Sequence, residues 1–430
     1  MYYSTRKTAP SATLKEAVLK GLAPDNGLYM PAHIPTLSAS FFEQIERKNL
    51  QEISLDVATA IFGEDVDAAS LKSIVYDAMS FEIPLVKITD EIYSLELFHG
   101  PTLAFKDVGA RFLSRLMKFF TADATHEINV LVATSGDTGS AVANGFLGIK
   151  GIKVTVLYPK GLVSKIQECQ FTTLGQNITA IEVAGTFDDC QRLVKQAFLD
   201  KELNEKKTLT SANSINLARF IPQAFYYFWA YSQMPKDLPI VCSVPSGNFG
   251  NLTAGLLAKR MGLPIEHFIA ANNSNDVFCQ YINTQRFTPR PSAATIANAM
   301  DVGNPSNFDR IVDLYQNSHS AVAADISACR YDDDAIRSIM QNAHQQTGYV
   351  LDPHGACGYE ALRTYVQQHK NVRGFFLETA HPAKFKDTVD DILQTKIEIP
   401  AKLQKFMQGT KQFVPMSSEF QAFKQYLIDN

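Results

Sequence analysis

The sequence has few cysteines, no surplus of basic residues and no apolar run long enough to cross a bilayer. Its six cysteines are scattered between Cys169 and Cys357, without a CxxC pair or the spacing of a zinc site. This pattern is typical of a protein from a reducing compartment, and no metal site is expected. The net charge of −4 argues against a nucleic-acid partner, which would require a basic face. Anionic ligands must therefore be bound by local dipoles and a few cations.

No targeting segment is apparent. The N-terminal residues lack the apolar stretch of a signal peptide. The most apolar segment, RFIPQAFYYFWAY (219–231), contains a proline and a glutamine and is too short to span a membrane, so it predicts a buried core helix. We therefore expect a cytoplasmic protein with no membrane partner. A chain of 430 residues is long enough for two or three packed units.

The pattern of apolar residues divides the chain into three parts. Residues 1–82 predict a small, mainly helical N-terminal domain, with amphipathic helices over 41–63 and 67–81. From about residue 90, short apolar runs alternate with helical periods, which predicts parallel sheets covered by helices in a core of two α/β subdomains over 83–396. Residues 397–430 are expected to form a C-terminal tail. The strand-like runs are 128–134, 153–159, 178–185, 238–245 and 374–380.

Polar loops follow several of these strands, at the edge where ligands bind in such folds. In SVPSGNFGNLTAG, Gly247 and Gly250 allow a close backbone approach, and successive N–H groups at a helix start suit a phosphate. The loop matches neither GxGxxG nor GxxxxGK[ST], which disfavours dinucleotide and P-loop sites. The alternative interpretation is a tight turn with an asparagine cap.

Other loops have similar features. ATSGDTG (133–139) places two hydroxyls at a helix start, which suits a carboxylate or is ordinary capping. TSANSINLAR (210–219) adds an arginine to hydroxyl and amide donors, as a phosphate site does, although a capped helix has the same pattern. LETAHPAKFKD (377–387) and DPHGACG (352–358) are further joins between a strand or turn and a helix, and a plain capped turn is a sufficient explanation of each.

One lysine is unusual. Lys106 ends the mostly apolar segment ELFHGPTLAFK and is followed by an aspartate. It could extend to solvent from an edge strand or loop. Alternatively, partial burial lowers its pKa, and the neutral amine attacks a carbonyl group. A reactive lysine, a phosphate loop and a carboxylate loop together suit a pyridoxal phosphate enzyme that acts on an amino acid.

The motifs EAVLKGLAPDNGLYMP, ELFHGPTLAFKD, ATSGDTGSA, SANSINLAR, VPSGNFGNLTAGLLAK and LETAHPAKFKD closely resemble the threonine synthase family, in the form with an extra N-terminal domain. The resemblance extends from Tyr3 to about Leu393, with the motifs in the family order. It implies fold type II of the pyridoxal phosphate enzymes, as in tryptophan synthase β. It also implies a lyase that converts O-phospho-L-homoserine and water to L-threonine and phosphate, the last step of threonine biosynthesis, as a monomer or homodimer.

The resemblance also assigns roles to individual residues. Lys106 would form the Schiff base with pyridoxal 5'-phosphate, and Asp137 would border the ring hydroxyl, where a charged carboxylate would repel a phenolate. Thr379 would face the pyridine nitrogen. The residues implied for the cofactor phosphate are Gly247, Asn248, Phe249, Gly250 and Asn251. Those implied for the substrate are Thr134, Ser135, Gly136 and Thr138 for its carboxylate, and Asn213, Ser214, Asn216 and Arg219 for its phosphate.

Two other functions are compatible with parts of this pattern. A serine/threonine dehydratase of the same fold would need no second phosphate site, so Arg219 and its neighbours discriminate against it. A non-catalytic protein that senses an amino acid or phosphate would be favoured if Lys106 or the 247–251 loop were lost, and both are present.

Overall fold

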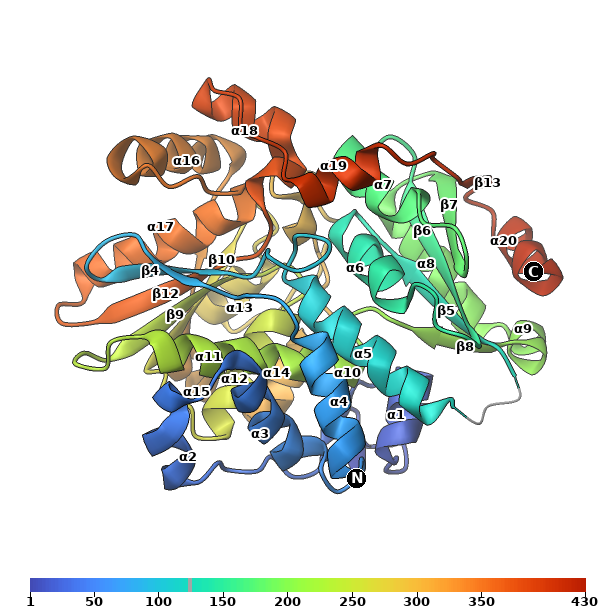
Figure 1. Cartoon of the computed structure of the whole chain (residues 1–430), viewed down its shortest axis with the longest axis horizontal. Coiled ribbons are helices and arrows are strands. Elements are labelled where there is room, and N and C mark those ends of the chain that lie inside the picture. The colour runs from blue at the N-terminus through green and yellow to red at the C-terminus, as the bar shows by residue number, and fades with distance from the viewer. Residues whose placement is uncertain (123–125) are drawn as a thin grey trace.

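Two β-sheets, each packed against helices, organise the protein (Figure 1). The computed structural model describes residues 1–122 and 126–430. The first sheet has the strand order β11-β10-β9-β12-β4-β3, in which the edge strand β3 is antiparallel and the other strands are parallel. Its strands are β3 (Leu85–Lys87), β4 (Ile92–Glu96), β9 (Ile240–Pro245), β10 (His267–Asn272), β11 (Ile326–Arg330) and β12 (Arg373–Glu378).

The second sheet is wholly parallel and has the order β13-β7-β6-β5-β8. Its strands are β5 (Ile128–Ala133), β6 (Ile152–Pro159), β7 (Ile178–Ala184), β8 (Thr208–Ser211) and β13 (Val414–Ser417). These two sheets confirm the α/β class and the two parallel-sheet subdomains predicted from the sequence. Each of the five apolar runs identified in the sequence overlaps a strand of one of the two sheets.

Burial on both faces explains why these strands are continuous apolar runs. In β5, Val130 and Val132 belong to the cluster that includes Val142 of helix α6 (Asp137–Phe146). The alternate residue Leu131 belongs to a separate cluster with Leu193 of helix α8 (Phe187–Leu199). The sheet is therefore covered from both sides, and ligands can reach it only at the strand ends.

The remaining helices follow the strands along the chain, and α5 lies centrally, between the two sheets (Figure 1). Those near the second sheet are α7 (Lys165–Thr172) and α9 (Lys201–Lys206). The others are α5 (Lys106–Phe120), α10 (Leu217–Phe220), η2 (Ile221–Gln223), α11 (Ala224–Gln233), α12 (Gly250–Arg260), α13 (Val277–Thr284), η3 (Asn298–Met300), α14 (Phe308–Leu314), α15 (His319–Asp325), α16 (Asp333–Thr347), α17 (Pro353–Gln368), η4 (Pro382–Phe385) and α18 (Lys386–Leu393).

The apolar segment 219–231 is buried, as predicted, but it is not one helix. It is divided into α10, η2 and α11, and Pro222 lies in the short 3₁₀ turn. Proline lacks the N–H that would continue an α-helix, so the break occurs there. In the described ranges of the chain, no helix combines the length and apolar character needed to span a bilayer.

The N-terminal region contains a two-stranded antiparallel sheet, β1 (Tyr2–Ser4) with β2 (Tyr29–Pro31), and several helices. These are α1 (Leu14–Lys20), α2 (Ala39–Gln44), η1 (Ile45–Arg47), α3 (Leu50–Phe62) and α4 (Ala68–Ala78). The single helix predicted over 41–63 is therefore wrong. The side chain of Asn49 accepts a hydrogen bond from the Glu52 N–H, and the two residues form a capping box that starts a new helix.

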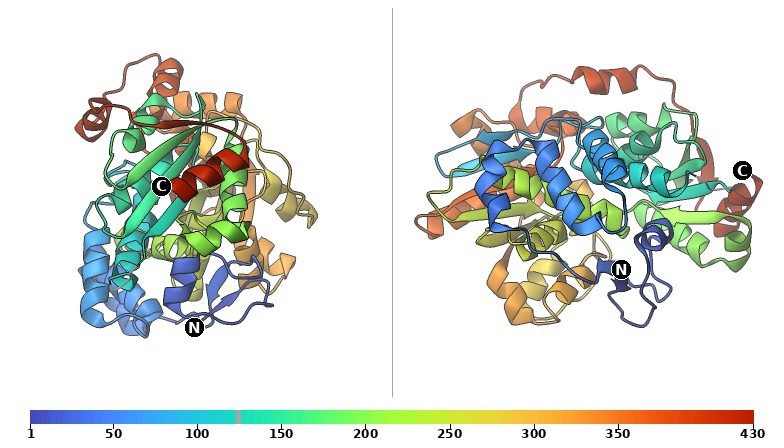
Figure 2. Two further views of the ribbon diagram at one scale, coloured as in Figure 1. Left: turned by 90° about the vertical axis from the view of Figure 1, so that its right-hand side faces the viewer. Right: turned by 60° about the horizontal axis from the view of Figure 1, so that its bottom comes forward.

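Residues 397–430 do not form a loose tail. Helix α19 (Ala401–Met407) packs against α7, β13 adds an edge strand to β7, and α20 (Phe420–Asp429) packs against α8 and α9. Figure 2 shows this segment passing over the molecule from one half to the other. Strand β13 alternates half-buried and exposed residues and contains a proline, so its short sequence gave no strand signal.

Arg310 of α14 joins the N-terminal region to the core. Its guanidinium group is fully buried and donates hydrogen bonds to the carbonyl oxygens of Tyr29, Ser214 and Ile215. It also lies 4.1 Å from the ring centroid of Phe220. A planar group with five donors suits this arrangement, and a lysine ammonium does not.

We therefore predict that Arg310→Lys lowers the free energy of unfolding by about 3 kcal/mol, because buried carbonyl groups lose charged donors. Urea denaturation followed by circular dichroism measures this change. The matched control is Arg286→Lys, which alters an exposed side chain. Equal denaturation midpoints for the two variants would contradict the structural role of Arg310.

Candidate active site

The loop between β4 and α5 is fixed by the segment that follows β12. The N–H of Leu97 donates to the carbonyl oxygen of Glu378 at 3.0 Å, and the N–H of Phe105 donates to that of Thr379 at 2.8 Å. In return, the N–H of His381 donates to the carbonyl oxygen of Leu103 at 3.1 Å. These bonds place Lys106 as the first residue of α5, a helix start that the sequence did not predict.

The amine of Lys106 has no hydrogen-bond partner among the described residues. It lies 5.7 Å from the ring centroid of Phe105. Burial lowers the pKa of Lys106 to about 8; the Asp137 carboxylate opposes this shift, whereas the charges of Arg219 and Lys384 add to it. With this pKa, about one amine in ten is neutral at pH 7, against fewer than one in a thousand for an ordinary lysine. Lys106 is thus suited to attack a carbonyl group.

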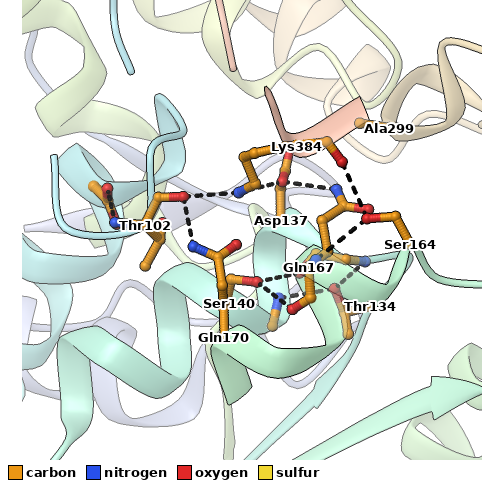
Figure 3. A network of polar contacts seen from close by, with 12 residues as sticks. Thr102, Thr134, Asp137, Ser140, Ser164, Gln167, Gln170, Ala299 and Lys384 are labelled. Atoms are coloured by element: carbon orange, nitrogen blue, oxygen red, sulfur yellow. Dashed lines mark hydrogen bonds and ion pairs between the residues drawn. The ribbon is translucent and has the colours of Figure 1, made fainter. Parts of the chain in front are cut away.

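A buried ion pair between Lys384 and Asp137 (Figure 3) lies close enough to Lys106 for the charges to interact. The ammonium group of Lys384 is 2.6 Å from the Oδ1 atom of Asp137 and donates to the carbonyl oxygen of Thr102 at 2.8 Å. The Nε2 group of Gln167 donates to the same Oδ1 atom at 2.9 Å. Burial alone would raise the pKa of Asp137, but the charges of Lys384 and Lys106 hold it below its usual range. Asp137 is therefore ionised.

Thr102 connects this pair to the start of α5. Its N–H and hydroxyl groups donate to the two carboxylate oxygens of Asp107 at 2.8 and 2.7 Å. Its carbonyl oxygen also accepts a hydrogen bond from Gln170 of α7. Consequently, one residue ties the lysine-bearing helix to η4 and to the helices of the second sheet.

The loop 134–138 leaves donors free for a ligand. The hydroxyl oxygen of Thr134 accepts from the N–H groups of Gly136 and Gly139 at 2.9 and 2.8 Å, which sets the turn. Gly136 has φ of +141°, and a Cβ there would lie 2.6 Å from the Gln167 side chain, so glycine is required. The half-buried hydroxyls of Ser135 and Thr138 have no hydrogen-bond partner in the described part of the chain. The geometry suits a carboxylate.

The loop 247–251 presents backbone donors to an anion. Within the described residues, none of its five N–H groups donates to a protein acceptor. Phe249, at the N-cap of α12, has φ of +59° and provides no side-chain cap. This uncapped helix start has the charge and the free donors that a phosphate requires.

The side chains of this loop serve a different purpose. Asn248 donates to the Ser214 hydroxyl and accepts from the Ser306 N–H, and its carbonyl oxygen accepts from Asn307. Asn251 donates to the carbonyl oxygen of Pro245. These side chains hold the loop in shape, so its backbone is the part that can bind a ligand.

The segment 213–219 adjoins this loop through Ser214 and contains a buried arginine. Arg219 donates to the carbonyl oxygen of Ala212, but its Nε group has no partner among the described residues. Burial lowers the pKa of Arg219 to about 10, against the opposing charge of Asp107. An arginine with an unused buried donor, close enough to Lys106 for their charges to interact, has the chemistry that suits an anion.

The other residues named in this segment differ in what they can offer. Both amide hydrogens of Asn216 are used, in hydrogen bonds to Val18 and Ser211, and its oxygen caps α10 through the Ala218 N–H. Asn216 therefore has no donor left for a phosphate, and its place in the substrate site, expected from the sequence, is a supporting one. The side-chain oxygen of Asn213 has no partner in the described chain.

Thr379 lies at the carboxyl end of β12 and is buried. Next to it, Glu378 accepts from the N–H of Asp352, and burial followed by the charge of Asp352 raises the pKa of Glu378. Asp352 caps α17, as a plain capped turn predicts, and also accepts a hydrogen bond from His354. The raised pKa favours the uncharged form of the Glu378 carboxyl group.

Several residues that shape the site were missed by sequence reasoning. Lys384 lies within the quoted motif LETAHPAKFKD but was not distinguished from a surface lysine. Gln167, Asn307 and Arg310 lie outside all the quoted motifs. The only available signal was the run NPSNFDR (304–310), which has the composition of a turn followed by a capped helix.

Three observations fit a phosphate-bearing aldehyde cofactor. Lys106 is half-buried and has a lowered pKa, the N–H groups of 247–251 have no acceptor among the described residues, and the buried Arg219 has an unused donor. Residues 84–374 match the family profile "Pyridoxal-phosphate dependent enzyme". Residues 1–79 match "Threonine synthase N terminus", and residues 355–427 match "Threonine synthase, C-terminal". The fold and the site therefore define a pyridoxal-phosphate-dependent enzyme of fold type II.

Comparison with individual proteins identifies the family within this class of enzymes. A threonine synthase from Haemophilus influenzae is 41% identical over 428 residues, which are 99% of each chain, and one from Escherichia coli K12 is 40% identical over 93% of each. The crystal structure of the Escherichia coli threonine synthase superposes with a TM-score of 0.93 at 37% identity, over 100% of this chain and 99% of that one. A pyridoxal-phosphate-bound threonine synthase from Brucella melitensis gives 0.92 at 35% identity, over 100% and 98%. The chain belongs to the threonine synthase family.

The glycines of the 247–251 loop give a test of the phosphate site. A Cβ on Gly247 would lie 2.6 Å from the Cα atom of Met300, so Gly247→Ala must displace backbone and should lower both thermal stability and pyridoxal phosphate affinity. A Cβ on Gly250 would lie 3.3 Å from the Cβ atom of Ser214. Gly250→Ala should therefore keep the melting temperature nearly unchanged and strain the Ser214–Asn248 bond. We predict that the cofactor binds about tenfold more weakly, because the net free energy of one hydrogen bond corresponds to about a tenfold change in Kd.

Absorbance titration with pyridoxal phosphate and thermal denaturation measure these two effects separately. If Gly250→Ala bound the cofactor as tightly as the wild type, the phosphate would have to lie elsewhere.

Proposed function

We propose that the protein converts O-phospho-L-homoserine and water to L-threonine and phosphate, the last step of threonine biosynthesis. The observation that carries the proposal is the second anion site: Arg219 is buried with an unused Nε donor, beside Lys106 and apart from the backbone donors of 247–251. An amino-acid substrate with its own phosphate needs both sites. The family membership and the names of the relatives support the same reaction.

The residues divide into those for the cofactor and those for the substrate. Lys106 would attach pyridoxal phosphate, whose phosphate the N–H groups of 247–251 would bind. Thr379, a neutral hydroxyl, would lie at the ring nitrogen, and Asp137 at the ring hydroxyl. When bound, the cofactor stabilises negative charge that develops on the carbon atoms of an amino acid.

Substrate recognition falls to the two remaining loops. Ser135, Thr138 and the N–H groups beside them would hold the substrate carboxylate. Arg219, with Asn213 and Ser214, would hold the substrate phosphate. A dianion in this buried place would gain charge-assisted hydrogen bonds, and Arg219 would gain a partner for its free Nε group.

Lys106 would then act as the base. A free amine with a pKa of about 8 can accept the proton from the α-carbon and return protons later, since its pKa lies near the working pH. Loss of a proton from the β-carbon lets the γ-phosphate leave, and water adds at the β-carbon. The buried walls around Lys106 limit the access of other water molecules to the reacting carbon atoms.

We also infer that the reaction takes place in the cytoplasm with a small molecule as the partner. All six cysteines are free thiols, four of them buried, which suits a reducing compartment.

The role of Lys106 is tested by borohydride reduction of the cofactor-loaded protein and peptide mapping. The label should appear on the peptide that contains Lys106. Lys106→Ala should lose all turnover and still bind pyridoxal phosphate weakly through 247–251, because the backbone donors remain. A label on another lysine would refute the assignment.

The role of Arg219 is tested by Arg219→Met, which keeps most of the side-chain volume. We predict a loss of about a hundredfold in kcat/KM for O-phosphohomoserine, because the buried phosphate loses a charged donor. Slow reactions with serine should change much less, and the substrate-free protein should not lose stability, since its buried charge has few partners.

Kinetic titrations with the two substrates make the comparison. Equal losses for phosphorylated and unphosphorylated substrates would mean that Arg219 is structural, and the dehydratase function would then be favoured.

A further inference from the structure

Two lysines face one carboxylate in this site. Both Lys106 and Lys384 act electrostatically on Asp137. The structure pairs Asp137 with Lys384, whose side chain is 0% exposed, whereas Lys106 is half-buried and makes no hydrogen bond among the described residues. The proposed reaction needs an uncharged amine on Lys106, and a carboxylate paired with that amine would keep it protonated.

The surroundings of Lys384 explain why it pairs with Asp137. A second acceptor, the carbonyl oxygen of Thr102, lies 2.8 Å from its ammonium group, and its own carbonyl oxygen accepts from the Ser164 hydroxyl at 3.1 Å. Gln167 reaches the same Asp137 oxygen from α7 at 2.9 Å (Figure 3). The carboxylate is thus oriented by two donors from outside α5, the helix that carries Lys106.

No other charged group among the described residues attracts the protonated amine of Lys106 as Asp137 does. Besides Asp137 on α6, the charged groups that act on its amine are Arg219 on α10 and Lys384 on η4, and both are cations. Asp107, the next residue on α5, has its two carboxylate oxygens bonded to Thr102. Asp137 is therefore the one anion, in the described part of the chain, that acts on the Lys106 amine.

We propose that Lys384 is a positioning residue of the active site: it binds Asp137 and so keeps that carboxylate from pairing with Lys106, which leaves the amine of Lys106 free to react. The inference rests on the proposed role of Lys106 and gives the buried pair a purpose beyond packing. It also answers the difficulty of a carboxylate at the ring hydroxyl, because the Asp137–Lys384 pair carries no net charge.

The inference predicts effects of opposite sign for the two partners. Lys384→Met removes a nearby cation and releases Asp137 to pair with Lys106, so the amine should hold its proton more tightly. Asp137→Asn leaves Lys106 facing only cations, so the amine should lose its proton more readily. The double variant Lys384→Met/Asp137→Asn removes both partners and should resemble the wild type.

Competitive acetylation measures the Lys106 amine directly. The full-length, cofactor-free protein is treated with trace acetic anhydride between pH 6.5 and 10.5, and acetylated Lys106 is quantified by mass spectrometry against an added reference amine. At pH 7.5, Lys384→Met should show about tenfold less labelling than the wild type, and Asp137→Asn about threefold more. The double variant should lie within about twofold of the wild type.

A purely structural Lys384 would give a different result. It would lower the melting temperature and leave the labelling curve of Lys106 in place, or both single variants would shift the curve in the same direction. Either result would overturn the inference. If Lys384→Met does not fold, Lys384→Gln replaces it: it removes the cation, keeps a donor near the carbonyl oxygen of Thr102 and leaves the Asp137 carboxylate in place, so it should be labelled less than the wild type at pH 7.5. Equal labelling would refute the proposal.

This measurement is independent of the borohydride test. It reads the protonation of Lys106 without any cofactor, so a failure of the proposed attachment site and a failure of the Lys384 inference are seen in different experiments.

Discussion

The ion pair between Lys384 and Asp137 is the interaction on which the arrangement of the site depends. Asp137 begins α6 beside the second sheet, and Lys384 lies in η4, after the central strand β12 of the first. Both side chains are buried, and a buried charge is tolerated only with a close partner and further hydrogen bonds. Thr102 and Gln167 provide those bonds. The pair therefore joins the two halves of the molecule beside the proposed position of the chemistry.

The two anion sites show how similar local structures acquire different roles. At 247–251 the side chains are used internally and the backbone N–H groups are free. In the segment 213–219 the unused donor belongs to a side chain, that of Arg219. The two segments are joined by the hydrogen bond between Asn248 and Ser214. Asn307 and Arg310 also donate hydrogen bonds to Ser214.

Much of the fold followed from the sequence because strands buried on both faces are continuous apolar runs, as in 128–133 and 240–245. The sequence drew attention to Lys106 and the 247–251 loop because a lysine after an apolar run and two glycines before a helix are locally unusual. Lys384 was not found, because its importance comes from Asp137 and Thr102, which are far from it in sequence. The helix break at Asn49 and the strand β13 were missed for a related reason. The capping box at Asn49 starts a new helix, and strand β13 forms because it pairs with β7.

The pairing of β13 with β7 has a consequence for the folding of the protein during its synthesis. Strand β7 ends at Ala184, but the strand that covers its edge begins at Val414, near the end of the chain. During synthesis, the second sheet therefore presents an open row of backbone N–H and C=O groups until residues 414–417 have left the ribosome. Such an edge can pair with another nascent chain. Strand β13 thus closes an edge that stays open while the intervening residues are synthesised.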